Sequence, residues 1–350
     1  MKRRTLLAAG LLAAILFVVQ TIVVHRVYAS QFLGGNDFYP RWAGARALFL
    51  EGRDPYDPAL TEEIAAVLDP QNQQTNSFTF AYPLHVVFVM GPLAFLPYEW
   101  AYAAWMVVVQ WVAFLLVVVL LRYHEWKPSP LAAAGLLISS IAFYPIARSI
   151  ILGQFTVHIT LFAALTLLAL KNDRDGLAGF FLAATSIKPQ MMIFLAPALL
   201  LWAARQRRWR FHKAFVASGI AFLVASMLIL PRWPLSFLED IPRYSATAGG
   251  RAPLRLLGEA ISPALAPAIQ VVVAGGLLLA VLMAWIGARR SQTTAAFLHA
   301  VNWTIVAGLL VPFQTGSTSQ ALLAIPLFTW LVAGLRRWGR GVIVICSALL

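Results

Sequence analysis

The chain has 350 residues, of which 60% are hydrophobic and 12% are charged. A soluble globular domain carries about twice that share of charged residues, so this composition excludes an ordinary soluble domain. The formal net charge is +13, but the basic residues gather in short loops between apolar runs, as in membrane proteins that follow the positive-inside rule. We therefore expect no nucleic-acid partner. The main basic loops are Lys2 to Arg4, Arg205 to Lys213, Arg289-Arg290 and Arg336 to Arg340.

The first apolar run, Leu6 to Val24, predicts the membrane topology of the N-terminus. It is long enough to cross a bilayer and longer than the apolar region of a signal peptide. With Lys2 to Arg4 kept inside, we expect an uncleaved span, a cytoplasmic N-terminus and a multi-pass protein of the plasma membrane. The single cysteine, Cys346, excludes an intrachain disulfide and a cysteine-based metal site.

The longest polar segment, residues 25–82, follows this span and is predicted to be a large outer loop with amphipathic helices. Asp37 is placed to cap the first helix, and Gly52 is placed to end it. The stretch Asp54-Pro55-Tyr56-Asp57-Pro58 is typical of a turn. A second short helix is expected to begin at Thr61.

The rest of the chain predicts an all-α polytopic membrane protein with about nine to eleven transmembrane helices in a single integral-membrane domain over residues 1–350. Residues 231–263 form a second outer loop in this topology. Gly153-Gln154 and Ser186 to Gln190 interrupt apolar runs, so we expect broken helices there. The runs 82–97 and 177–204 are each compatible with a full span or with half-helices.

Charged residues in or at the edge of a membrane are candidates for function, because removing them from water is costly. Asp37 is compatible with two roles, a helix cap and a general base that takes a proton from an attacking hydroxyl. Arg41 lies one turn further on and is placed to tune that carboxylate or to bind phosphate. Lys188 lies too deep in its run to reach water easily, and Arg148 is either functional or interfacial.

No sequence motif for metal binding, for a phosphate-binding P-loop or for a serine nucleophile is present. Asp173 and Asp175 have the spacing of a metal-binding pair, but they lie in a short basic loop. We interpret both as solvated loop residues. We therefore expect no metal and no cofactor.

Several short motifs occur in an order that resembles glycosyltransferase family 87, the polyprenol-phosphate-mannose-dependent mannosyltransferases of the C-type superfamily. The resemblance covers about residues 30 to 215. Near the last spans, family members often carry Ser-Pro-x-Ser-Trp-x-His, whereas residues 311–319 contain neither Trp nor His. The motifs are Asp37-Phe38-Tyr39, Gly52-Arg53-Asp54-Pro55-Tyr56-Asp57, Phe80-Ala81-Tyr82-Pro83-Leu84, Leu152-Gly153-Gln154, Ala178-Gly179, Ile187-Lys188-Pro189 and Arg207-Arg208-Trp209-Arg210.

The resemblance implies a C-type glycosyltransferase fold and an inverting hexosyltransferase that uses a polyprenyl-phosphate sugar. The acceptor is then a hydroxyl of a lipid or glycan on the outer face. Asp37 takes the role of catalytic base. The residues expected to bind the donor's phosphate and sugar are Lys188, Arg148, Gln154, Arg41, Tyr39 and Tyr82.

Two other functions are compatible with the sequence. A transporter or flippase for lipids or small molecules also has broken helices and cations in the membrane. It needs no carboxylate in an outer loop, and no internal repeat of the kind such proteins carry is evident. A non-catalytic scaffold of the cell envelope would tolerate changes at Asp37.

Overall fold

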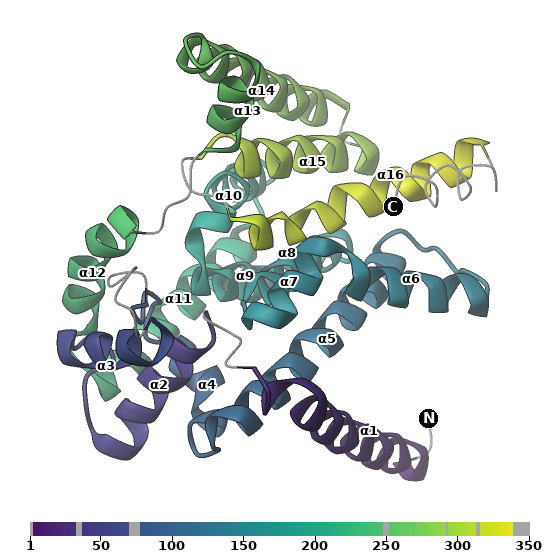
Figure 1. Ribbon diagram of the computed structural model, residues 1–350. Coiled ribbons are helices and arrows are strands. Elements are labelled where there is room, and N and C mark those ends of the chain that lie inside the picture. Colours follow the sequence, from purple (N-terminus) through teal and green to yellow (C-terminus); the bar gives the residue numbers. More distant parts are fainter. Residues whose placement is uncertain are drawn as a thin grey trace. The chain divides into compact units, whose positions relative to one another are not determined.

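The computed structural model describes residues 3–32, 37–69, 78–247, 252–291, 293–312 and 316–338. Every regular element within these residues is a helix (Figure 1), which confirms the predicted all-α fold. The chain divides into two compact units. The first contains residues 1–113, 146–155 and 221–249, and the second contains residues 114–145, 156–220 and 250–350.

The first unit contains the N-terminal span and the described helices of the first predicted outer loop. It also contains α12, which belongs to the second predicted outer loop. Helix α1 continues into a π-helical turn, η1, so the first apolar segment runs five residues beyond Val24. Helices α5 and α11 begin or end in this unit and cross into the second. The other elements are α1 (Arg3–Val24), η1 (His25–Ala29), α2 (Tyr39–Arg46), η2 (Ala47–Glu51), α3 (Pro58–Leu68), α4 (Val86–Ala94), α7 (Tyr144–Leu152) and α12 (Trp233–Thr247).

The second unit contains most of the remaining helices. Helices α13, α14 and α15 lie side by side (Figure 1). Helix α9 approaches α11 so closely that a Cβ on Gly179 would lie 2.3 Å from the carbonyl oxygen of Phe211. The elements are α5 (Tyr98–Tyr123), α6 (Pro130–Ala142), α8 (Thr156–Lys171), α9 (Asp175–Ala184), η3 (Thr185–Ile187), η4 (Pro189–Met192), α10 (Leu195–Arg205), α11 (Trp209–Ile229), α13 (Pro253–Ile261), α14 (Ala266–Ser291), α15 (Thr294–Leu310), η5 (Ser317–Leu323) and α16 (Ala324–Trp338).

Among the described residues, five helical segments are long and apolar enough to cross a membrane, and α6 with α7 makes a sixth if the bent pair is one span. Four shorter apolar helical segments accompany them, formed by α8, by α9 with η3, by α10 and by α15. The multi-pass membrane prediction is therefore confirmed. The predicted number of nine to eleven crossings stays a prediction, and so does the predicted C-type fold.

Both predicted breaks are present. Gly153, with φ of +67°, lies just beyond the end of α7, and α8 begins at Thr156. The sequence did not predict a further bend of 57° at Phe143, between α6 and α7. The apolar run 177–204 is interrupted by η3 and η4, with Lys188 between them in a non-helical conformation. Pro189 explains this second break, because proline restricts the residue before it and cannot donate a backbone hydrogen bond.

Two predictions about the outer loop are wrong. The N-cap residue of α2 is Phe38, and no side chain makes a capping hydrogen bond there, so Asp37 is not the cap. Helix α3 begins at Pro58 rather than at Thr61, because the Asp57 carboxylate accepts a hydrogen bond from Ala59 N at 2.9 Å and Pro58 suits a first helical turn. The predicted end at Gly52 is confirmed, since this residue adopts φ of +66°.

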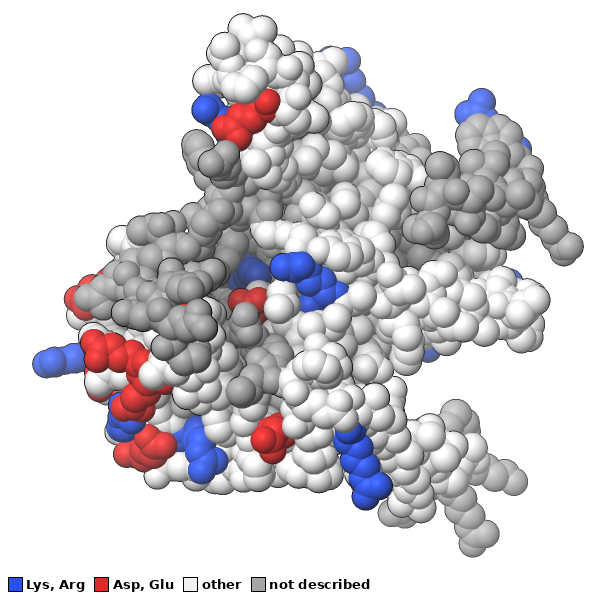
Figure 2. Space-filling model, in the orientation of Figure 1, with Lys and Arg blue, Asp and Glu red and all other residues white. Residues whose placement is uncertain are grey.

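Helices α2 and α3 pack their apolar faces against each other. Their shared core is small and contains Ala43, Ala47, Leu60 and Ile64. On the outward face, acidic and basic side chains gather over α2 and α3 (Figure 2). An apolar inner face with a charged outer face fits a segment that projects from the membrane into water.

Candidate functional site

The candidate site begins at Asp37, whose position is set by the next residue. Phe38 is completely buried and packs among the rings of Tyr98, Tyr102 and Trp105, with centroids 5.8–6.1 Å away. Asp37 itself is half-buried, and its carboxylate has no hydrogen-bond partner among the described residues. An anchored backbone therefore holds a carboxylate whose oxygens no described group occupies.

The Gly153 carbonyl is the centre of the buried part of this region. It accepts hydrogen bonds from Arg41 Nη1 at 2.7 Å and from Trp105 Nε1 at 2.8 Å. Tyr102 Oη donates to the nearby Ile151 carbonyl. These carbonyls end α7 and lack partners within the helix, so donors from α2 and α5 satisfy them. The positive charge of Arg41 also matches the negative end of the α7 dipole.

Tyr82 and Gln154 extend this arrangement through side chains. Arg41 Nη2 donates to Tyr82 Oη at 2.7 Å, and Tyr82 Oη donates to Gln154 Oε1 at 3.2 Å. The Arg41 guanidinium also lies over the Tyr82 ring, with Cζ 4.4 Å from its centroid. Three of the residues predicted to bind the donor, Arg41, Tyr82 and Gln154, therefore form one connected cluster.

The motif over residues 52–57 contacts the backbone of Tyr82 and so supports the cluster of Arg41, Tyr82 and Gln154. Asp54 Oδ1 accepts a hydrogen bond from Tyr56 N at 2.9 Å, which fixes a tight turn, and the buried Tyr56 Oη donates to the Tyr82 carbonyl at 2.6 Å. Burial is the main cause that raises the pKa of the Tyr56 phenol, with smaller contributions from Asp54 and Asp240. The phenol therefore stays protonated and keeps donating. This motif therefore holds the backbone of Tyr82 in place.

Arg41 differs from an ordinary buried arginine because no carboxylate pairs with it among the described residues. Its side chain is 1% exposed, and its Nε has no hydrogen-bond partner there. The Arg41 guanidinium donates to Gly153 and Tyr82 rather than to Asp37, so of its two predicted roles this geometry favours the binding of phosphate. A guanidinium cannot lose its proton, and a buried charge without a counterion is costly. The cluster is therefore suited to an anionic ligand.

The other predicted residues lie in different surroundings. The ring of Tyr39 packs against Trp42 and Tyr98, with centroids 5.6 and 4.9 Å away. Arg148 is exposed on α7. Lys188 is 8% exposed and belongs to the second unit, at the break between η3 and η4. The donor-binding roles of these three residues stay predictions.

Sequence reasoning missed Trp105, which holds the Gly153 carbonyl. Trp105 lies in a long apolar run with several other tryptophans, and nothing in that pattern distinguishes it.

Among the described residues, no group of three or more His, Cys, Asp or Glu side chains is arranged to hold a metal ion.

We expect Gly153→Ala to destabilise the first unit strongly. A methyl group at this position would lie 2.5 Å from Phe38 Cβ, and the backbone has φ of +67°. The conformational strain costs about 1–2 kcal/mol, and the overpacking adds about 1–3 kcal/mol. The measurement is thermal unfolding of the protein in detergent.

Gly52→Ala is the matched control for this substitution, because Gly52 has nearly the same φ of +66° but open space around the added methyl group. It should show only the conformational strain. Equal losses for the two variants would contradict the contact between Gly153 and Phe38.

One of three comparisons with known proteins identifies a family. The model of glycosyltransferase family 87 matches residues 80–312, which is more than half of the chain. This stretch includes Tyr82, Gly153-Gln154 and Lys188 but not Asp37 or Arg41. No curated protein matches the chain, and no solved structure matches it. The chain therefore belongs to glycosyltransferase family 87.

Proposed function

We propose that this membrane glycosyltransferase moves a sugar, with mannose as the first candidate, from a polyprenyl-phosphate donor to an acceptor hydroxyl on the outer face of the plasma membrane. The observation that supports it best is that two groups suited to this chemistry lie four residues apart in the chain. Asp37 is a carboxylate without a hydrogen-bond partner among the described residues, and Arg41 is a buried cation without a carboxylate partner there. Family membership supplies the reaction class.

In the proposed step, the Asp37 carboxylate takes the proton of the acceptor hydroxyl as its oxygen attacks the anomeric carbon. The new bond forms on the face opposite the phosphate, and the bond between the anomeric carbon and the phosphate oxygen breaks. The electron pair of that bond leaves with polyprenyl phosphate. Attack from the opposite face inverts the configuration of the sugar.

The leaving phosphate needs positive charge that does not have to reorganise during the reaction. Arg41 supplies such a charge because its side chain is fixed by Gly153 and Tyr82. From the resemblance alone, we assign Lys188 and Arg148 to binding of the donor. A monophosphate leaves rather than a nucleoside diphosphate, so we propose that transfer needs no metal ion.

The decisive experiment incubates the purified protein with radiolabelled polyprenyl-phosphate-mannose and a membrane lipid extract, with and without a metal chelator. We expect the label to appear in a lipid or glycan product in both conditions. A parallel reaction with labelled nucleotide-mannose should give no product.

Two outcomes would overturn the proposal. Transfer from the nucleotide sugar alone would reject the polyprenyl-phosphate donor. If reconstituted vesicles move the labelled lipid across the bilayer chemically unchanged and form no product, the protein is a flippase.

A further inference from the structure

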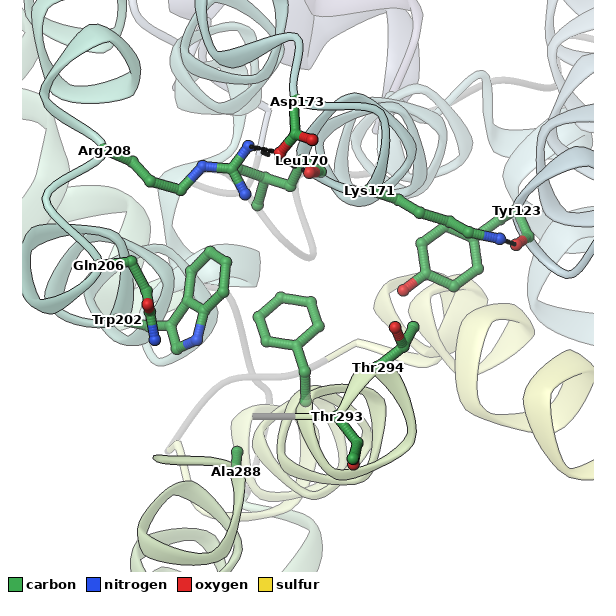
Figure 3. Close-up of a pocket in the computed structure, with 11 residues that line it drawn as sticks. Tyr123, Leu170, Lys171, Asp173, Trp202, Gln206, Arg208, Ala288, Thr293 and Thr294 are labelled. Carbon is green, nitrogen blue, oxygen red and sulfur yellow. Dashed lines mark hydrogen bonds and ion pairs between the residues drawn. The ribbon is translucent and has the colours of Figure 1, made fainter. Parts of the chain in front are cut away.

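The second unit contains a cavity of about 440 Å³ that the proposed reaction does not use. Its lining comes from the ends of α5, α8, α10, α14 and α15, and includes Phe297. Figure 3 shows Tyr123, Lys171, Asp173, Trp202, Gln206 and Arg208 around it. The ends of apolar membrane-spanning helices lie at the level of the lipid headgroups. The basic loops around the cavity are those that the positive-inside rule places on the cytoplasmic side.

Arg208 is held in a fixed orientation at the cavity wall. Its Nε donates to Asp175 Oδ1 at 2.8 Å, and its Nη2 donates to Asp173 Oδ1 and to the Leu170 carbonyl, each at 3.1 Å. The interpretation as a solvated loop residue is therefore wrong for Asp175, whose side chain is 16% exposed. Asp173 is 91% exposed and thus solvated as predicted, and it also accepts a hydrogen bond from Arg208. The remaining terminal nitrogen, Nη1, has no hydrogen-bond partner among the described residues and faces the cavity (Figure 3).

Lys171 supplies a second cation. Its Nζ donates to the Tyr123 carbonyl at 2.6 Å and to Glu125 Oε1 at 2.7 Å. An ammonium group has three donors, so one remains after these two contacts. The rings of Trp202 and Phe297 pack with centroids 4.5 Å apart and give the cavity an apolar wall.

Three carboxylates, those of Asp173, Asp175 and Glu125, pair with these two cations. The side chains of Asp173 and Glu125 are 91% and 75% exposed, so water screens their charge, and only Asp175 is largely buried. A fixed guanidinium and an ammonium group with unused donors suit phosphate oxygens, and basic pockets between helix ends are typical sites for anionic lipid headgroups.

We propose that this cavity is a phosphate-binding site, separate from the Asp37 cluster, that takes the phosphate group of a membrane phospholipid. Nη1 of Arg208 and Nζ of Lys171 donate to the phosphate oxygens, and the rings of Trp202 and Phe297 contact the apolar part of the lipid. The proposal does not depend on the transferase reaction.

The test measures lipid retained by the full-length protein in neutral detergent, by native mass spectrometry, with phosphatidylglycerol compared with phosphatidylcholine of the same chains. The pocket variant carries Lys171→Gln and Arg208→Lys. The Arg208→Lys change keeps a cation for Asp175 but loses Nη1. The control variant carries Arg207→Gln and Arg210→Lys, which make the same change in charge on exposed side chains close to Arg208 in the chain.

We expect the wild type and the control to retain phosphatidylglycerol preferentially, and the pocket variant to lose about tenfold in affinity, or about 1.4 kcal/mol. In a second arm, glycerol phosphate and inorganic phosphate are titrated against delipidated protein and thermal unfolding is followed. Stabilisation of the wild type but not of the pocket variant, without lipid preference, would support the phosphate site and assign it to a soluble phosphate.

Equal retention by all three proteins, or equal loss in pocket and control variants, would overturn the proposal in favour of diffuse surface charge. Lys171→Gln alone serves if the double variant does not fold, because its side chain lies at the surface, 25% exposed. Unchanged binding by that single variant would reject the role of Lys171 in the site.

Discussion

Replacing Asp37 with asparagine is expected to abolish sugar transfer while leaving folding and donor binding intact. Asparagine keeps the size of the side chain but cannot accept the proton of the acceptor hydroxyl. Loss of a general base lowers the turnover rate by about a hundredfold to ten-thousandfold. Because no side chain caps α2, the substitution removes no capping hydrogen bond and should leave thermal unfolding unchanged. Transfer rate, donor affinity and unfolding temperature are measured on the same preparation.

Glu62→Gln is the control, because it removes an exposed carboxylate of the same charge from the neighbouring helix α3. It should retain full activity. Wild-type turnover by Asp37→Asn would remove the assignment of Asp37 as the base. A large drop in its unfolding temperature would instead show a structural role for this carboxylate.

The second large effect is expected at Arg41. Arg41→Met removes a buried charge that has no carboxylate partner among the described residues, while Gly153 O keeps Trp105 and Tyr82 Oη keeps Gln154. At an effective dielectric constant of about 20 and a separation of about 8 Å, that charge stabilises a phosphate by about 2 kcal/mol. We therefore expect the affinity for a polyprenyl-phosphate sugar to fall about thirtyfold.

Charge dependence separates this role from packing. Arg41→Lys should recover part of the affinity, and a neutral polyprenyl-linked sugar without phosphate should bind Arg41→Met and the wild type equally. Arg46→Met is the control in the same helix, where the arginine donates to the Ala94 carbonyl at 3.0 Å. Unchanged affinity of Arg41→Met for the anionic donor would contradict the proposed role.

The interruptions of the helices could be predicted from the sequence because their causes are local. Gly52 and Gly153 adopt positive φ angles that glycine tolerates, and Pro189 breaks the helix next to Lys188. The alternation of apolar runs and basic loops is similarly local, and it indicates a polytopic membrane protein without any tertiary information.

The incorrect or incomplete predictions concern features that depend on tertiary contacts, or for which the sequence allows two interpretations. Asp37 and Asp57 are both placed before a helical pattern, and only the folded backbone shows that Asp57 caps and Asp37 does not. The direction of the Arg41 side chain depends on a carbonyl 112 positions along the chain. No spacing rule connects residues as far apart in the chain as Arg41 and Gly153. The sequence therefore indicates Arg41 as a candidate site residue but not its hydrogen-bond partners.

The two hydrogen bonds to the Gly153 carbonyl limit how a sugar could be recognised at the corner, the turn at Gly153 between α7 and α8. A carbonyl oxygen has two lone pairs, and here Arg41 and Trp105 use both. It therefore has no acceptor site left for a sugar hydroxyl or for water. Any sugar that reaches this corner has to be recognised through hydrogen bonds to side chains, such as that of Gln154. Engineering of sugar selectivity should accordingly vary those side chains and leave the backbone of the corner unchanged.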